Sequence, residues 1–143
     1  MRLFARDAKI DAFRQAPLFE GFSRKELGEL AKLTDDLDVN AGKVLCKEGE
    51  FGHEFFVIMA GEVEVTRHGK TIATFGSGDF VGEIALIEDV RRTATVTAAT
   101  PVRFFVMTRR AFLRLLDGNP AVERKVLRAL AKRVVSTSSD PRL

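Results

Sequence analysis

Cysteine, histidine and long apolar runs are all scarce in this chain of 143 residues. The single cysteine, Cys46, excludes an internal disulfide bond, which is typical of proteins from a reducing compartment. No stretch approaches the roughly 18 uncharged apolar residues that a membrane span requires. Residues 1–7 lose their apolar character too soon to form a signal peptide. These absences predict a cytoplasmic protein without a membrane span.

The rest of the composition is that of an ordinary globular protein. Hydrophobic residues make up 45% of the chain and charged residues 30%. A chain of this length can enclose a hydrophobic core, so we expect one domain over residues 1–143. Cys46 lies in an apolar run and is expected in that core. The net charge of +3 is too small to require a polyanionic partner.

Both ends of the chain have helical patterns. Apolar residues in the segment 3–15 have a loose helical spacing, which Pro17 ends. Ser23 and Glu26 form a capping box, which predicts the start of a second helix. Residues 110–116 and 120–135 form two further predicted helices, separated by a break at residues 117–119. Residues 136–143 are expected to be disordered.

The middle of the chain, from residue 36 to residue 108, has short β patterns instead. Residues 55–59 form an apolar run typical of a buried strand, and residues 62–66 alternate with period two. His68 and Gly69 predict a tight hairpin into a strand at 71–75. About eight short strands, spaced about 8–12 residues apart, predict an antiparallel sandwich, jelly roll or barrel.

A glycine and a carboxylate stand between two of these strands, at the start of a helix-prone turn. Gly82 and Glu83 open this turn, which continues with Ile84, Ala85 and Leu86. A glycine lets the backbone approach a ligand closely, and unpaired N–H groups in such a turn would favour an anion. The glutamate can accept a hydrogen bond from a ribose 2′-hydroxyl.

An arginine follows this glutamate at a distance of nine residues, at position 92. The planar guanidinium of Arg92 can make a two-point, charge-assisted contact with a phosphate that lysine cannot copy. Thr93 offers a hydroxyl beside it, within reach of a purine edge. The segment therefore predicts a site for a ligand with both a sugar hydroxyl and a phosphate.

Residues 80–86 and 92–95 together resemble the phosphate-binding cassette of the cyclic nucleotide-binding domain family. This family is the cAMP and cGMP receptor module of bacterial regulators, protein kinases and ion channels. The spacing from glutamate to arginine is kept, and glycines at 49, 52 and 61 match the family's structural glycines. The resemblance covers nearly the whole chain and gives a predicted core over residues 18–135. It implies a mainly β fold, an eight-stranded antiparallel β-roll or jelly roll with N-terminal helices and a C-terminal helical lid.

The resemblance also implies a role for individual residues. Glu83 would bind the ribose 2′-hydroxyl and Arg92 the cyclic phosphate, while amides of Ala85 and of Thr93 or Ala94 would complete the phosphate cradle. Arg91 is expected to face solvent, because the family spacing selects Arg92. The implied ligand-binding residues are Gly82, Glu83, Ile84, Ala85, Arg92, Thr93 and Ala94. The implied base pocket consists of Val65, Phe75, Phe80, Arg133 and Val134.

The implied ligand is cAMP or cGMP, without a further cofactor. Relatives with threonine at the position of Thr93 often accept cGMP, although some prefer cAMP, and the frequency of bacterial cAMP receptors favours cAMP here. In the family, ligand binding draws the C-terminal helices over the pocket, and Leu86 occupies the position that contacts their hinge. Arg133 could stack on the base as a cation–π contact or remain a solvated charge.

The sequence after residue 135 carries no helix-turn-helix, kinase or enzyme signature. We expect a non-enzymatic regulatory module that signals to an unknown protein effector. The alternative is the ligand-sensing part of a transcription regulator or ion channel whose output domain is absent. The basic residues of the last helix fit its solvated face, so direct DNA binding is not expected.

Two other hypotheses are disfavoured. A metalloenzyme of the cupin type shares the jelly-roll outline, but His53 and His68 are the only histidines and lie on separate predicted loops. We therefore expect neither a metal site nor an enzyme. A degenerate scaffold that has lost its ligand is disfavoured because both Glu83 and Arg92 are retained.

Overall fold

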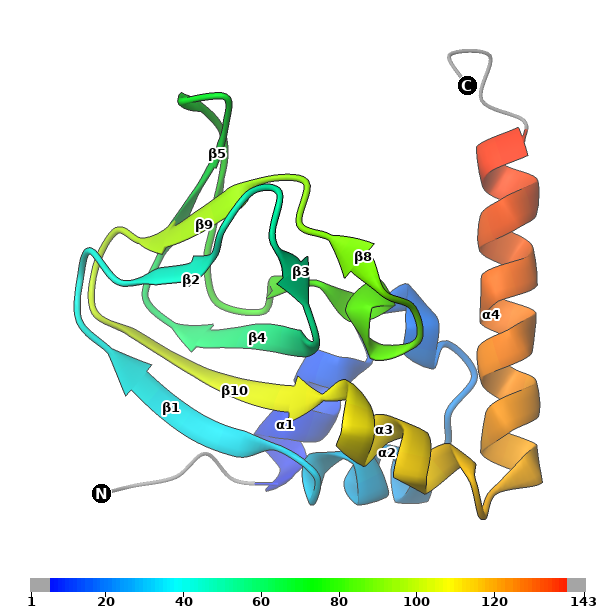
Figure 1. Cartoon of the computed structure of the whole chain (residues 1–143). Helices are drawn as coiled ribbons and strands as arrows, with labels where there is room; N and C mark the ends of the chain where they lie inside the picture. Colours follow the sequence, from blue (N-terminus) through cyan, green and yellow to red (C-terminus); the bar gives the residue numbers. More distant parts are fainter. Residues whose placement is uncertain (1–5, 139–143) are drawn as a thin grey trace.

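Two four-stranded antiparallel sheets form the body of the molecule (Figure 1). The computed structural model describes residues 6–138, with side chains through residue 132. The strands are β1 (Asp35–Val39), β2 (Val44–Cys46), β3 (Phe51–Gly52), β4 (Glu54–Ala60), β5 (Val63–Arg67), β6 (Lys70–Phe75), β7 (Phe80–Val81), β8 (Val90–Arg91), β9 (Thr95–Ala98) and β10 (Val102–Thr108). The first sheet has the order β1-β10-β4-β7, the second has the order β2-β9-β5-β6, and β3 pairs with β8 alone.

The first sheet is covered on both faces, which explains the continuous apolar run of β4. Side chains alternate across a strand. Phe55 and Val57 therefore point into a cluster shared with the helices, whereas Phe56 and Ile58 belong to the cluster that both sheets share. The predicted buried strand at residues 55–59 is confirmed.

The N-terminal helices close the outer face of this sheet. The capping box is confirmed, because the Ser23 hydroxyl accepts a hydrogen bond from the Glu26 amide and the Glu26 carboxylate accepts one from the Ser23 amide. Ile10 and Phe13 are 2% and 0% exposed. The hydrophobic core therefore includes residues of the first helix. The helices are α1 (Arg6–Phe13), η1 (Pro17–Phe19) and α2 (Arg24–Ala31).

Two helices follow the last strand, α3 (Arg109–Leu116) and α4 (Pro120–Ser138). The predicted break between them is confirmed, and the Asn119 amide donates to the carbonyl of Leu116 across it at 3.0 Å. Because α4 continues to Ser138, the prediction that the chain is disordered from residue 136 is wrong for residues 136–138. Residues 139–143 lie outside the described residues.

Helix α4 packs against η1 and α3 and stands beside the roll as a separate column (Figure 1). Val122 and Val126 bury its apolar stripe. Ion pairs also hold this helix in place. Lys125 Nζ lies 2.5 Å from a carboxylate oxygen of Glu26. Lys132 makes a similar contact with Glu20 at 2.7 Å. The helix is thus held by the N-terminal helices.

The predicted fold class, a mainly β roll with flanking helices, is confirmed. The described residues form ten strands rather than about eight. The additional strands are β3 and β8, which pair Phe51 with Arg91 and Gly52 with Val90. The sequence carries no strand signal for β3, because a two-residue strand has no periodicity and forms only by pairing with a distant partner.

Candidate functional site

A cavity of about 560 Å³ opens between the turn η2 (Glu83–Leu86) and the β5–β6 hairpin. One wall comes from residues 80–85 and 90–94, which include the predicted cassette, and the other comes from β5 and β6. The structure brings together every predicted site residue whose side chain is described. These residues are Val65, Phe75, Phe80, Gly82, Glu83, Ile84, Ala85, Arg92, Thr93 and Ala94.

Two predicted base-pocket residues, Arg133 and Val134, belong to α4. Their side chains lie outside the described residues, so their predicted role stays a prediction. None of the described residues of α3 and α4 lines the cavity. In the described part of the chain, the predicted lid is therefore not closed over the site.

Sequence reasoning missed several residues of the lining: Cys46, Arg67, Ile72, Ala73, Val81, Val90, Arg91 and Val96. Strand alternation could have found one of them, since Arg67 lies two residues after Val65 on the same face of β5. Arg91 is exposed, as predicted, but it also lines the rim. Its guanidinium lies 4.3 Å from the centre of the Phe51 ring.

Two glycines make room for the phosphate-binding candidate. Gly82 has φ of +84°, in the left-handed region, and a Cβ there would overlap the guanidinium of Arg92 and lie 2.9 Å from the carbonyl oxygen of Glu54. A Cβ on Gly52 would also overlap this guanidinium. Both positions therefore require glycine for the arginine to take its observed place.

Arg92 is nearly buried, with 8% of its side chain exposed. Its Nη2 donates to the carbonyl oxygen of Glu54 at 2.9 Å and lies 3.8 Å from the Glu54 carboxylate, which is half-exposed. A guanidinium held at the edge of a cavity with so distant a carboxylate partner provides a binding point for an anion.

Glu83 is also buried, at 4% exposure, and it lines the same cavity. Its Oε2 accepts a hydrogen bond of 3.0 Å from the backbone amide of Leu18, in η1. The carboxylate therefore joins the cavity to the N-terminal helices. No feature of the local sequence around residue 83 could have predicted that contact.

The turn η2 satisfies part of its own backbone. The Ala85 amide donates to the carbonyl oxygen of Gly82 at 3.1 Å. The prediction that the amides of this turn are unpaired is thus wrong for Ala85, because the segment forms a tight 3₁₀ turn. A phosphate contact from this amide would require the hydrogen bond to be shared or the turn to shift.

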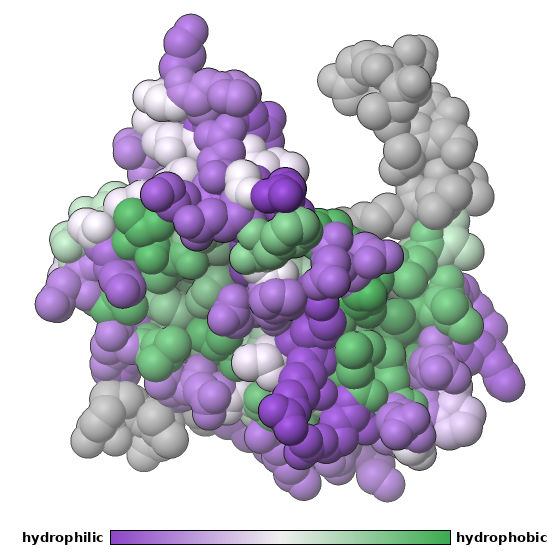
Figure 2. All heavy atoms as spheres, in the orientation of Figure 1, coloured by the Kyte–Doolittle hydropathy of each residue, from purple (hydrophilic) through white to green (hydrophobic). Residues whose placement is uncertain are grey.

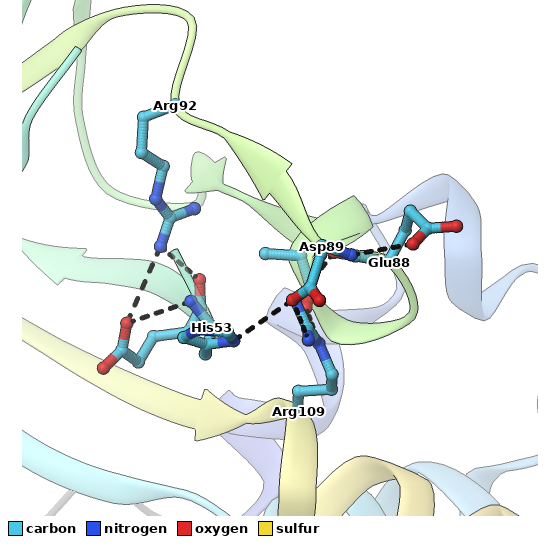
Figure 3. Close-up of polar contacts among 7 residues, drawn as sticks. His53, Glu88, Asp89, Arg92 and Arg109 are labelled. Atoms are coloured by element: carbon cyan, nitrogen blue, oxygen red, sulfur yellow. Dashed lines mark hydrogen bonds and ion pairs between the residues drawn. The ribbon is translucent and has the colours of Figure 1, made fainter. Parts of the chain in front are cut away.

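Arg109, the first residue of α3, ties the cassette to the C-terminal helices (Figure 3). Its guanidinium donates to the carbonyl oxygens of Ala85 and Glu88, each at 2.7 Å, and pairs with Asp89 at 2.5 Å. The hydrogen bond and charge of Arg109 lower the pKa of Asp89, and His53, at 3.8 Å, lowers it less. One side chain thus holds the cassette turn against α3.

Comparison with known proteins assigns the family. A family model described as "Cyclic nucleotide-binding domain" matches residues 37–119. The chain belongs to the cyclic nucleotide-binding domain family. This domain is a regulatory module. The matched segment contains the whole cassette wall and both strands of the β5–β6 hairpin.

Individual relatives agree with this family. The domain is 35% identical to a cAMP-dependent protein kinase regulatory subunit of Yarrowia lipolytica over 78% of the chain, which spans 30% of that protein. It is 33% identical to a cGMP-dependent protein kinase of Eimeria tenella over 77% of the chain and 11% of that protein. The chain thus spans less than a third of the length of either relative.

A solved structure gives the same fold. The N-terminal domain of a transcriptional regulator from Streptomyces coelicolor A3(2) superposes with a TM-score of 0.84 at 28% identity. The match covers 91% of this chain and 96% of that one. The predicted family and fold are therefore confirmed together.

Two kinds of feature are absent from the part of the chain that the structure describes. Within it, no group of three or more histidine, cysteine, aspartate or glutamate side chains could hold a metal ion. Its helices include none that is long and apolar enough to cross a membrane.

Proposed function

We propose that this domain is a receptor for a cyclic purine nucleotide, in which Arg92 binds the cyclic phosphate and Glu83 binds the ribose 2′-hydroxyl. The proposal rests on the burial of the Arg92 guanidinium at the edge of the cavity. This guanidinium occupies space that a Cβ on Gly52 or Gly82 would fill. Thr93 and Ala94 continue the cassette wall, and Val65, Phe75 and Phe80 offer apolar surface to the base.

cAMP is the first candidate ligand and cGMP the second. The two kinase proteins reported above are named for cAMP and for cGMP, so both ligands occur among proteins similar to this domain. The Thr93 hydroxyl, beside the cavity, is the observation that favours the second candidate, because it could accept a hydrogen bond from the 2-amino group of guanine.

The signal would leave the site through the C-terminal helices. Arg109 connects the cassette turn to α3, and Glu83 connects it to η1, on which α4 packs. A shift of the cassette on ligand binding would thus reach α4 from two sides, with residues 117–119 as the hinge. The receiver would be a separate protein effector in the cytoplasm. The alternative is a sensor within a transcription regulator or ion channel, and the S. coelicolor structure supports the transcription regulator.

The binding proposal is tested by calorimetric titration of the domain with cAMP and with cGMP. Arg92→Ala is expected to weaken binding by about 10- to 150-fold, the worth of a charge-assisted hydrogen bond of about 1.5–3 kcal/mol. Arg103→Ala is the matched control, because Arg103 pairs with Asp38 outside the cavity. Absence of binding to the wild-type domain at millimolar nucleotide would refute the receptor function.

The signalling proposal is tested by hydrogen exchange of backbone amides with and without nucleotide. Ligand binding should change the exchange of residues 109–138 as well as that of the cassette. Protection limited to the cassette and the β5–β6 hairpin would contradict the proposed route.

A further inference from the structure

The C-terminal helices differ in charge from the rest of the chain. Residues 1–108 contain 14 lysines and arginines against 17 carboxylates, whereas residues 109–143 contain 9 against 3. Carboxylates elsewhere in the fold pair with three of these cations: Arg109, Lys125 and Lys132. Within the described chain, four others have neither a hydrogen bond nor an ion pair from their side chains: Arg110, Arg114, Arg124 and Arg128. The two helices therefore present an excess of unpaired positive charge.

An open groove lies where α3 meets α4. It has a volume of about 510 Å³ and is lined by Arg110, Leu113, Arg114, Leu116, Asp117 and Glu123. Leu127 lies one turn after Glu123 on the same side of α4, so it extends the groove along that helix. We call these seven residues the α3–α4 groove.

Apolar surface faces water on both helices of this groove. Leu113 and Leu127 are 43% and 62% exposed. Figure 2 shows apolar surface, in green, on the side of the molecule where α3 and α4 lie. Single exposed leucines need no explanation, but apolar side chains gathered in a hollow and bordered by charges are typical of an interaction site. Arg110 and Arg114 provide that border on α3, because each lies within one turn of Leu113.

We infer that the α3–α4 groove is a docking surface for an acidic amphipathic helix of a partner protein. The inference rests on the proposed function and deepens it, because it gives the chemistry of the effector. Apolar side chains of the partner helix would cover Leu113, Leu116 and Leu127, as in other complexes of a helix with a groove. Carboxylates beside them would pair with Arg110 and Arg114. The charges select the partner, and the leucines supply the buried apolar area.

Two carboxylates in the groove argue against a nucleic acid or an anionic membrane as its occupant. Asp117 and Glu123 line the groove together with the arginines. Both carboxylates would repel a row of phosphate groups packed at this place. A protein helix can instead place a lysine or a neutral side chain opposite them. A second copy of this chain is the remaining alternative, because residues 1–108 carry more carboxylates than cations.

The test is the binding of a synthetic peptide, measured by fluorescence anisotropy without nucleotide. The peptide has about 18 residues, or about five helical turns, with leucine at every third or fourth position and glutamate on both flanks. Its controls are a peptide of the same composition in scrambled order and a peptide with lysine in place of glutamate. We expect the glutamate peptide to bind at least about tenfold more tightly than either control.

Variants of the domain locate the peptide. Leu127→Gln should weaken binding at least about fivefold, because less apolar surface leaves water in the complex. Leu37→Gln is the matched control, since Leu37 is 45% exposed on β1 and lies outside the groove. Arg110→Glu combined with Arg114→Glu should reverse the preference, so that the lysine peptide binds more tightly than the glutamate peptide. Unchanged midpoints of unfolding in urea would verify that these exposed substitutions preserve the fold.

Several results would overturn the inference. They are failure of the glutamate peptide to bind, equal binding by Leu127→Gln and the wild type, and tighter binding of phosphatidylserine vesicles or duplex DNA than of the peptide. A dimer that forms without peptide and is lost in Leu127→Gln, measured by sedimentation, would assign the groove to a second copy instead.

A titration with nucleotide separates this inference from the proposed function. Saturating cAMP or cGMP should change the affinity for the glutamate peptide, because binding at two coupled sites is reciprocal. An unchanged affinity would overturn the assignment of the groove to the effector. Nucleotide binding without peptide binding would also overturn the inference alone. Peptide binding without binding of either nucleotide would refute the proposed receptor function.

Discussion

The two walls of the cavity are constructed in different ways. The cassette wall depends on residues from distant parts of the sequence: Gly52 leaves space for Arg92, the Glu54 carbonyl accepts its hydrogen bond, and Arg109 supports the turn. The hairpin wall depends on neighbours in sequence, since β5 and β6 pair directly through the turn at residues 68–69.

Because of this difference, we expect the cassette wall to determine how rigidly the site is held and the hairpin wall to determine which base it prefers. The side chains of Glu83 and Arg92 are held by hydrogen bonds to distant backbone groups before a ligand arrives, so binding carries little further cost of ordering these two side chains. The hairpin can change a side chain without disturbing those contacts. Substitutions in the cassette should therefore affect stability and all ligands, whereas hairpin substitutions should change the preference among bases.

The largest expected effect is that of Gly82→Ala. The new Cβ would displace the Arg92 guanidinium, and loss of its charge-assisted contact with the phosphate would cost about 1.5–3 kcal/mol, or about 10- to 150-fold. We expect nucleotide affinity to fall by about that factor in calorimetry. Gly78→Ala is the matched control, because Gly78 also has a positive φ but no atom lies within 4 Å of the place that a Cβ would take there. Equal affinities for the two variants would show that the close approach does not matter.

Arg109→Ala should have the next largest effect. Loss of its hydrogen bonds to Ala85 and Glu88 leaves two carbonyl groups without this partner. We expect the free energy of unfolding in urea to fall by about 2–3 kcal/mol. Arg110→Ala, on the same helix turn, should stay within about 0.5 kcal/mol of the wild type. If the two variants unfold alike, the cassette does not depend on α3.

The reactivity of the Cys46 thiol should report whether a ligand occupies the cavity, because Cys46 is buried and lines the cavity. Burial raises the pKa of its thiol, an effect that the charge of Arg92 partly offsets. Because an ordinary thiol has a pKa of about 8.5, reaction with a disulfide reagent should still accelerate above that pH. Nucleotide at about ten times its dissociation constant should slow the reaction about tenfold. An unchanged rate would place the ligand elsewhere.

The smallest effect is expected for Asp89→Asn. Because Arg109 lowers the pKa of Asp89, this carboxylate stabilises the fold above its unfolded pKa of about 3.9 and loses that contribution as the pH falls through its folded pKa. The Tm of the variant should lie slightly below that of the wild type at pH 7, and the two should converge in acid. A difference that persists below about pH 2 would exclude titration of Asp89 as its cause. Asp38→Asn, whose pKa Arg103 lowers outside the cavity, should leave nucleotide affinity unchanged.

Several parts of the fold and site were predictable because their signals are local. The capping box at Ser23, the buried strand of β4 and the cassette from Gly82 to Arg92 are each contained in a short segment. The β3–β8 pair and the contact between Glu83 and Leu18 were not predictable, since each joins residues far apart in the sequence. The position of Arg67 was partly predictable from strand alternation, but its hydrogen bond to Thr93 was not.

The sequence by itself determined the family, the mainly β class and the residues of the cassette, because these depend on residue type and spacing along one segment. The tertiary structure alone decided that Glu83 accepts a hydrogen bond from the Leu18 amide, that Arg109 joins the cassette to α3 and that Arg67 stands beside Thr93. These features depend on which distant backbone groups meet. Such contacts follow from the packing of the two sheets and their helices, and no single segment of the sequence encodes that packing.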